Sequence, residues 1–134
     1  MTDRPQPLIL VVHGDLGKLT EIDSILGRSG YLITTCSTPA DAKKAVAGNK
    51  VDLVLIGPMG DKADEVGLTW KVKEIRPTTK VLLLHESKDW ADSIAPLDPG
   101  ADDLLSAPYT RDELLEAVRK LIDQTVLPPP ESGS

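Results

Sequence analysis

The sequence contains one cysteine, no phenylalanine and few aromatic residues of any kind. Because Cys36 is the only cysteine, no disulfide can form within the chain. Aromatic side chains make up only 3% of the residues, so leucine, isoleucine, valine and alanine must fill the core. No apolar run approaches the roughly 18 residues that cross a membrane. Residues 1–7 are polar and lack an apolar stretch of signal-peptide length. We therefore expect a cytoplasmic protein with no membrane partner.

The charge balance is acidic and resembles that of an ordinary globular domain. The 134 residues carry 15 basic and 21 acidic side chains, which gives a formal net charge of −6. The acidic residues are spread along the chain, and no run of lysine and arginine marks a nucleic-acid-binding face. We expect no nucleic-acid partner. The length corresponds to one domain, large enough to bury a core without disulfides or a structural metal.

Five short segments are predicted to form strands. Four are continuous apolar runs without alternation, which is typical of strands covered on both faces in a parallel sheet. The fifth is half polar and rich in β-branched residues, as expected of an edge strand. In chain order the predicted strands are Leu8–Val12, Tyr31–Cys36 (the edge strand), Val51–Ile56, Val81–Leu84 and Leu104–Ala107.

Helical patterns fill the gaps between these strands. A first helix runs from about Leu16 and ends near Gly30, and a second begins at Thr38-Pro39 with proline at its first position. A third ends before Pro77, and residues 89–94 form a short fourth. The last helix begins with a Thr110-to-Glu113 capping box. We expect a domain over residues 1–126 and a proline-rich linker or disordered tail over residues 127–134.

Five alternating strand and helix units predict a doubly wound α/β fold with a parallel five-stranded sheet and helices on both faces. In such folds the functional site lies at the carboxyl ends of the strands, near the switch in strand order. The residues that follow the strands are therefore the candidate site, namely His13, Gly14, Asp15, Cys36, Gly57, Pro58, His85, Glu86, Ala107 and Pro108.

Two segments resemble response-regulator receiver domains. Residues 100–109 have the sequence Gly-Ala-Asp-Asp-Leu-Leu-Ser-Ala-Pro-Tyr. They are similar to the receiver segment in which Gly-Ala-Asp-Asp leads into the fifth strand and a Lys-Pro-aromatic triplet. Asp52–Ile56 also resembles the third receiver strand. The similarity extends from about Leu8 to Ile122. It implies the flavodoxin-like (CheY-like) fold with strand order 2-1-3-4-5, and a role in two-component signalling and phosphorelay.

Aligned on these segments, the chain lacks the residues of aspartyl phosphorylation. The two adjacent acids after the first strand correspond to His13 and Gly14, and the phosphoryl-accepting aspartate corresponds to Gly57. The Thr or Ser after the fourth strand corresponds to His85, and the lysine before the proline to Ala107. The resemblance also implies a cis bond before Pro108.

These replacements remove each chemical component of the reaction. Gly57 offers no carboxylate nucleophile. Only Asp15 remains near the edge as a hard oxygen ligand, so we expect the Mg²⁺ site to be lost and no cofactor to bind. Ala107 and His85 supply neither a lysine nor a hydroxyl to the phosphoryl group. The sequence therefore predicts a degenerate pocket, and a pseudo-receiver that is not an enzyme. The pocket residues are His13, Gly14, Asp15, Gly57, His85, Ala107 and Pro108.

Several alternatives remain open for this edge. Asp61, in the loop after the third strand, or Asp15 is a possible surrogate acceptor, although both are also typical of loop or N-cap residues. His13 and His85 flank the third strand, and with Cys36 they are a possible transition-metal site. In that case the vacated pocket, with the gap left by Gly57, would serve a metal or small-molecule sensor. The simpler interpretation is that the two histidines fill the pocket.

A partner surface is expected on the face of the fourth helix, fifth strand and fifth helix. In receivers this face meets partners and forms dimers. Here it would carry Trp90, Leu104 at the position of the receiver switch aromatic, and Tyr109 after the proline. Trp70 lies off the apolar stripe of the third helix, so we also expect it to be exposed. The resemblance implies a protein partner: a histidine kinase, an output domain or a second copy of the chain.

Overall fold

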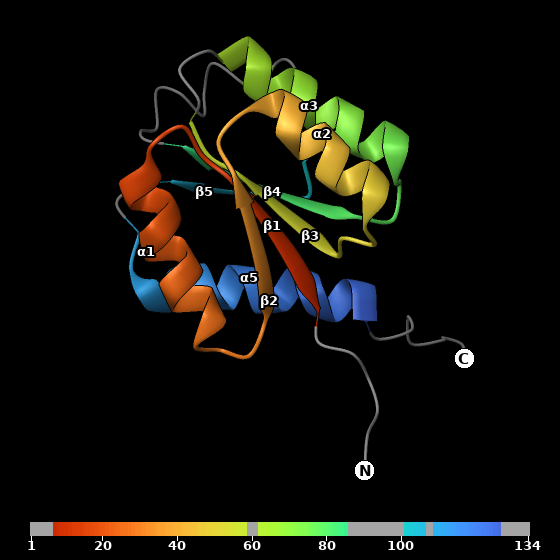
Figure 1. The fold of residues 1–134 in the computed structure, drawn as a ribbon. Coiled ribbons are helices and arrows are strands. Elements are labelled where there is room, and N and C mark those ends of the chain that lie inside the picture. Colours follow the sequence, from red (N-terminus) through yellow and green to blue (C-terminus); the bar gives the residue numbers. More distant parts are fainter. Residues whose placement is uncertain (1–6, 59–61, 86–100, 107–108, 127–134) are drawn as a thin grey trace, which may run out of the picture.

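The computed structural model describes residues 7–58, 62–85, 101–106 and 109–126. Over these ranges strands and helices alternate along the chain, as Figure 1 shows. The elements are β1 Leu8–Val12, α1 Leu16–Gly27, β2 Leu32–Cys36, α2 Pro39–Gly48, β3 Leu53–Ile56, α3 Lys62–Ile75, β4 Lys80–His85, β5 Asp103–Ser106 and α5 Arg111–Val126.

The five strands form one parallel sheet in the order β2-β1-β3-β4-β5. This confirms the predicted order 2-1-3-4-5 and the edge position of β2. The register places Val12 of β1 level with Ile56 of β3, and Ile56 level with Leu83 of β4. The carboxyl ends of β1, β3 and β4 therefore meet at one edge of the sheet.

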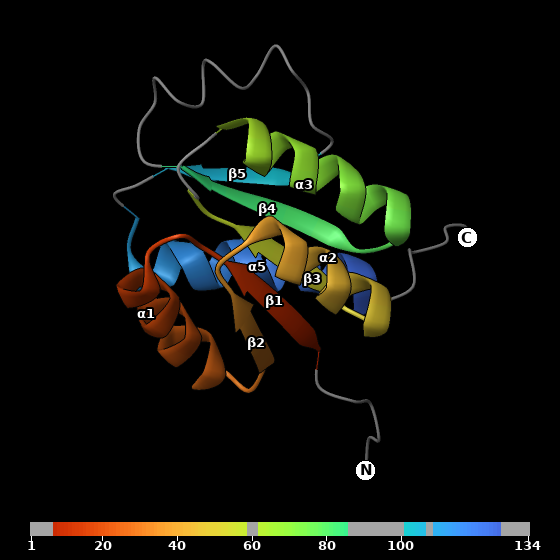
Figure 2. The same cartoon turned by 45° about the horizontal axis from the view of Figure 1, so that its top comes forward.

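The sheet lies between two layers of helices, with a separate core on each face. In Figures 1 and 2, α1 and α5 cover one face and α2 and α3 cover the other. Alternate residues of each strand face the two layers, so Val11 packs on the α1 and α5 side and Val12 on the α2 and α3 side. Leucine, isoleucine, valine and alanine supply the buried apolar side chains of the described residues, as the absence of phenylalanine predicted.

The predicted helix starts are confirmed by their capping interactions. Thr38 caps α2 by accepting a hydrogen bond from the Asp41 backbone N–H, and Pro39 takes the first helical position. At α5, Thr110 Oγ1 accepts from the Glu113 N–H at 3.0 Å, and Glu113 Oε1 accepts from the Thr110 N–H at 2.8 Å. This reciprocal pair is the expected capping box.

Other boundaries differ from the prediction by a few residues. The first helix ends at Gly27 rather than near Gly30, and Gly30 instead takes the left-handed conformation of the turn into β2 (φ 94°). The predicted fourth helix, 89–94, lies outside the described residues, as does the tail 127–134. The separation of that tail from the domain stays a prediction. Within the described ranges, no helix is long and apolar enough to cross a membrane.

Two aspartates connect the strands at the amino edge of the sheet. Asp52 Oδ2 accepts a hydrogen bond from the Leu8 N–H at 2.9 Å, which joins the starts of β1 and β3. Asp102 Oδ2 accepts from the Val81 N–H at 2.9 Å and from Lys73 Nζ at 2.7 Å, and Lys80 Nζ lies 3.7 Å from Oδ1. The first aspartate of the Gly-Ala-Asp-Asp segment therefore connects β4, α3 and the start of β5.

We expect Asp102→Ala to lower the free energy of unfolding by about 1–3 kcal/mol, because it leaves the Val81 N–H and the Lys73 ammonium without their acceptor. The neighbouring Asp103 accepts only from the adjacent Leu104 N–H among the described hydrogen bonds. Asp103→Ala is therefore the matched control, and we expect it to change stability by less than about 0.5 kcal/mol. Urea unfolding measures both variants; equal effects would contradict the structural role of Asp102.

Candidate functional site

The carboxyl ends of β2, β1 and β3 are joined by backbone hydrogen bonds that continue past the strands. The His13 N–H donates to the Cys36 carbonyl at 3.2 Å, and the Gly57 N–H donates to the Val12 carbonyl at 2.7 Å. The Gly14 N–H donates to the Pro58 carbonyl at 2.9 Å. As predicted, His13, Gly14 and Gly57 therefore lie beside one another at this edge.

The imidazole of His13 occupies the space that a side chain at position 57 would need. His13 is only 4% exposed. A Cβ atom built on Gly57 would lie 2.3 Å from His13 Cδ2, 2.9 Å from Cγ and 3.0 Å from Nε2. Real Cβ contacts are not this short, so any larger residue at position 57 requires the ring to move. His13 therefore fills the space beside Gly57, as the simpler interpretation of the histidines predicted, and the alternative of an open gap there is wrong.

Register could have revealed this contact from the sequence. Once β1 and β3 are paired in parallel, the residue after Val12 is level with the residue after Ile56. When a bulky side chain is level with a glycine on the neighbouring strand, the bulky side chain can fill the space that a side chain at the glycine position would need.

His13 and Asp15 interact through the loop into α1. The Asp15 N–H donates to His13 Nδ1 at 3.0 Å, so this ring nitrogen is an acceptor and carries no proton. The Asp15 side chain in turn accepts from the Gly17 N–H at 2.8 Å and the Lys18 N–H at 3.3 Å. This confirms Asp15 as the N-cap of α1. Its carboxylate is engaged with backbone donors.

Cys36 ends β2, next to His13, and is partly buried. Burial, together with the negative charge of Asp41, raises the pKa of its thiol to about 11, against a backbone hydrogen bond from Thr38 that lowers it. A thiol with this pKa stays protonated at neutral pH, whereas a metal ligand must be the thiolate. Among the described residues, no group of three or more His, Cys, Asp and Glu side chains could hold a metal ion.

Several predicted site residues fall at or beyond the limits of the described residues. The backbone of His85 ends β4, and its partner in β5 is Ser106. Because Leu84 is level with Gly57, His85 lies one residue further along the edge than His13. Its side chain lies outside what the structure describes, as do Asp61, Glu86, Trp90, Ala107 and Pro108. The cis bond before Pro108 stays a prediction.

Part of the predicted partner face is described. Leu104 on β5 is 40% exposed. Tyr109 is partly buried and packs against the core on the α1 and α5 side. Of the two, Leu104 is the more accessible to a partner.

The parallel sheet, its strand order and the position of the site at its carboxyl edge define a doubly wound α/β domain of the flavodoxin type. Residues 9–119 match the response regulator receiver domain family, and the chain belongs to it. It is 27% identical over 117 residues to "Response regulator MprA" of Mycobacterium sp. (strain KMS), covering 87% of this chain and 51% of that protein.

Two further relatives agree. "Alkaline phosphatase synthesis transcriptional regulatory protein PhoP" of Bacillus subtilis (strain 168) is 27% identical over 124 residues, covering 92% of this chain and 52% of that protein. The crystal structure of a CheY-like receiver domain protein from Methanospirillum hungatei JF-1 superposes with a TM-score of 0.81 at 22% identity, covering 90% of this chain and 97% of that one. The chain therefore spans about half the length of these curated relatives.

A double-mutant cycle tests the contact between His13 and Gly57. We expect Gly57→Ala to lower the free energy of unfolding by about 1–3 kcal/mol, because the new methyl group overlaps the imidazole. In a His13→Ala background the same change should cost much less, giving a coupling energy of about 1 kcal/mol or more. Urea unfolding of the four proteins measures the cycle.

Gly67→Ala is the matched control for the cycle, because a Cβ at Gly67 meets no atom within 4 Å. Its effect on stability should be the same with and without His13. Additive effects of Gly57→Ala and His13→Ala would contradict the arrangement at the edge.

The protonated state of Cys36 predicts slow chemical modification. We expect the native thiol to react with a disulfide reagent far more slowly at pH 8 than an exposed cysteine does, because little thiolate forms below a pKa of about 11. The rate should rise steeply with pH toward that value, and unfolding in urea should abolish the protection. A native rate at pH 8 equal to the unfolded rate would contradict this assignment.

Proposed function

We propose that the chain is an atypical pseudo-receiver, which transmits a signal by protein–protein interaction and takes no phosphoryl group on aspartate. The overlap between His13 and any side chain at position 57 carries this proposal. In receivers a carboxylate projects from this position. Here the position has no side chain, and a buried ring fills the adjacent space.

The remaining groups at the edge do not supply the missing chemistry. A phosphoryl transfer needs a nucleophile and cationic groups or a metal ion to stabilise the developing charge. The position of the receiver lysine holds Ala107, and the two positions of the receiver acids hold His13 and Gly14. The order of residues in the sequence also suggests no Ser/His/Asp or Cys/His triad, so we propose that the chain is not an enzyme.

The described donors do not fit Mg²⁺. This ion prefers near-octahedral oxygen ligands and few nitrogen ligands. Asp15 is the single carboxylate among the described pocket residues, and it already accepts two backbone hydrogen bonds at the start of α1. We therefore propose that the domain works without a cofactor.

The loss of all the charged groups together is energetically consistent. A buried carboxylate cluster without its metal or lysine would cost several kcal/mol for each unpaired charge. A neutral imidazole above a glycine removes that cost and keeps the edge packed. The domain thereby retains a stable scaffold for contacts with other proteins.

We propose a cytoplasmic protein partner: a histidine kinase, an output domain or a second copy of the chain. The relatives of about twice this length include response and transcriptional regulators. The exposed Leu104 on β5 supports a contact on the predicted face of the fourth helix, β5 and α5. The displaced-aspartate and sensor alternatives gain no specific support, because Asp15 caps α1 and His13 fills the gap beside Gly57.

Incubation with acetyl phosphate and Mg²⁺, followed by intact-mass spectrometry, tests this proposal. We expect no mass gain of one phosphate, because position 57 offers no carboxylate. A gain would overturn the proposal. Loss of that gain in Asp61→Asn or Asp15→Asn would then identify the displaced acceptor.

A positive control restores the receiver residues in the same chain. It carries His13→Asp, Gly14→Asp, Gly57→Asp, His85→Thr and Ala107→Lys together, and circular dichroism checks that it folds. We expect this variant to gain one phosphate under the same conditions. A variant with the other four substitutions but with Gly57 unchanged should not gain the phosphate. That result would assign the acceptor to position 57.

A further inference from the structure

The charge of this acidic chain is unevenly distributed between the two faces of the sheet. Residues 39–80, which contain α2, β3 and α3, carry eight basic and six acidic side chains. The other 92 residues carry seven basic and fifteen acidic side chains. This segment therefore has a formal net charge of +2, whereas the rest of the chain has −8. No run of basic residues in the sequence is longer than two, and the contact between α2 and α3 places the α2 lysines beside those of α3.

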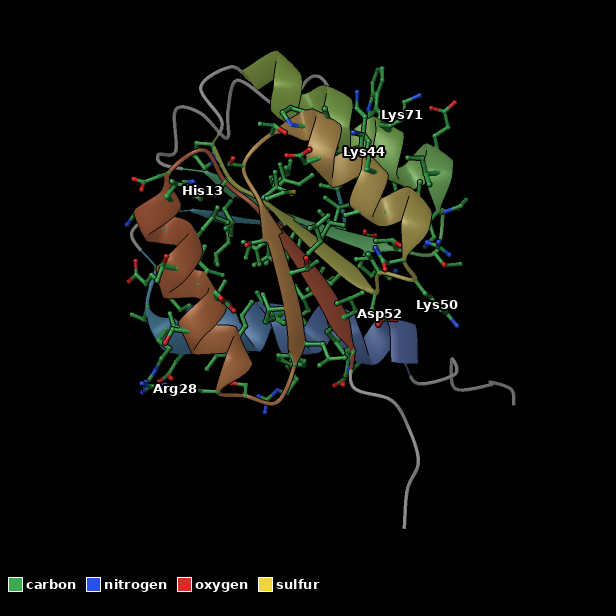
Figure 3. All side chains as sticks on the ribbon, in the orientation of Figure 1. His13, Arg28, Lys44, Lys50, Asp52 and Lys71 are labelled. Carbon is green, nitrogen blue, oxygen red and sulfur yellow. The ribbon has the colours of Figure 1, made fainter. Side chains whose placement is uncertain are left out.

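Three lysines of this layer are exposed and make no described ion pair: Lys43 and Lys44 on α2 and Lys50 after it. Three other lysines nearby have carboxylate partners. Lys73 and Lys80 contact Asp102, and Lys71 Nζ lies 3.1 Å from Glu74 Oε1. Figure 3 shows Lys44 and Lys71 on the two neighbouring helices, directed away from the sheet, with Lys50 at the end of α2.

An exposed tryptophan lies on the same layer. Trp70 on α3 is 58% exposed, as expected from its position off the apolar stripe. It shares the outward side of α3 with Gly67, one turn earlier, and with Glu74, one turn later. Trp70 and Leu16 are the two most exposed large apolar side chains among the described residues. Tryptophan is the residue most enriched at the energetic centres of protein interfaces.

Gly67 adds an independent observation. It lies in the interior of α3, where glycine is about 1 kcal/mol less favourable than alanine. Neither a close neighbour nor a left-handed backbone requires glycine here, since a Cβ at this position meets nothing within 4 Å. Its missing side chain leaves the surface one turn before Trp70 open. Gly67 thus lowers the intrinsic stability of α3 at the place where it leaves the Trp70 indole accessible.

We propose that the α2–α3 face, defined by Lys43, Lys44, Lys50, Gly67, Trp70 and Lys71, docks an acidic segment of another protein that carries an apolar side chain. The lysines attract the carboxylates, and the apolar side chain packs on Trp70 beside Gly67. This face is distinct from the β5 side that carries Leu104. Nucleic acid is disfavoured as the occupant because the rest of the chain, with fifteen acidic and seven basic side chains, repels phosphate.

Fluorescence anisotropy with a defined peptide tests the proposal. The probe is a fluorescein-labelled twelve-residue peptide of Glu-Glu-Leu repeats, titrated with the full chain at low and at physiological salt. We expect saturable binding that weakens as salt increases. Lys43→Glu with Lys44→Glu should weaken it about tenfold, and Trp70→Ala should weaken it comparably.

Two control variants separate this surface from general charge and from misfolding. Lys18→Glu with Lys120→Glu makes the same charge change on α1 and α5, on the opposite face, and should change the affinity less than about twofold. Gly67→Gln introduces a better helix former, so we expect Tm to rise by about 2 °C while the affinity falls. A loss of binding in this variant cannot come from unfolding.

Four outcomes would overturn the proposal. They are the absence of saturable binding, an equal loss in the control on the opposite face, unchanged affinity in both Trp70→Ala and Gly67→Gln, and tighter binding of a twelve-nucleotide oligouridine than of the peptide. Sedimentation equilibrium of the chain alone addresses the remaining occupant. Self-association that Lys43→Glu with Lys44→Glu abolishes would assign the surface to a second copy instead.

Discussion

The packing of the His13 ring beside the Cα of Gly57 sets the character of the whole carboxyl edge. The parallel register places these residues level on β1 and β3, so one large side chain fits there only if its neighbour has none. The ring is held in place because Nδ1 accepts the Asp15 N–H, and Asp15 in turn caps α1. A larger residue at position 57 would therefore displace the His13 ring and disturb the Asp15 cap at the start of α1.

The two edges of the sheet differ in the polar side chains that they carry. At the carboxyl edge the described residues place a buried imidazole beside a glycine. At the amino edge, Asp52 accepts a hydrogen bond from the Leu8 N–H, and Asp102 accepts from the Val81 N–H and contacts Lys73. Figure 3 shows His13 and Asp52 at opposite ends of the sheet. Among the described residues, the amino edge thus carries carboxylates that support the fold, whereas the His13 ring fills the carboxyl edge beside Gly57.

The two proposed protein contacts lie on different parts of the domain. A rigid scaffold of two cores on one sheet presents different surfaces on its two sides. One includes Leu104 at β5, and the other joins lysines of α2 to Trp70 of α3. Steering by charge and anchoring by one large aromatic side chain are complementary, because the first acts at a distance and the second only at contact.

The sequence by itself determined the strand order, the helix caps at Thr38 and Thr110, and the absence of a carboxylate at position 57. Those features depend on local propensity, or on residue identity within a family pattern. Only the tertiary structure decided that the His13 ring overlaps the position of a Cβ at residue 57, that Asp102 joins β4 to α3, and that lysines of α2 lie beside α3. These depend on register and on contacts between residues far apart in the chain, which periodicity along a sequence does not encode.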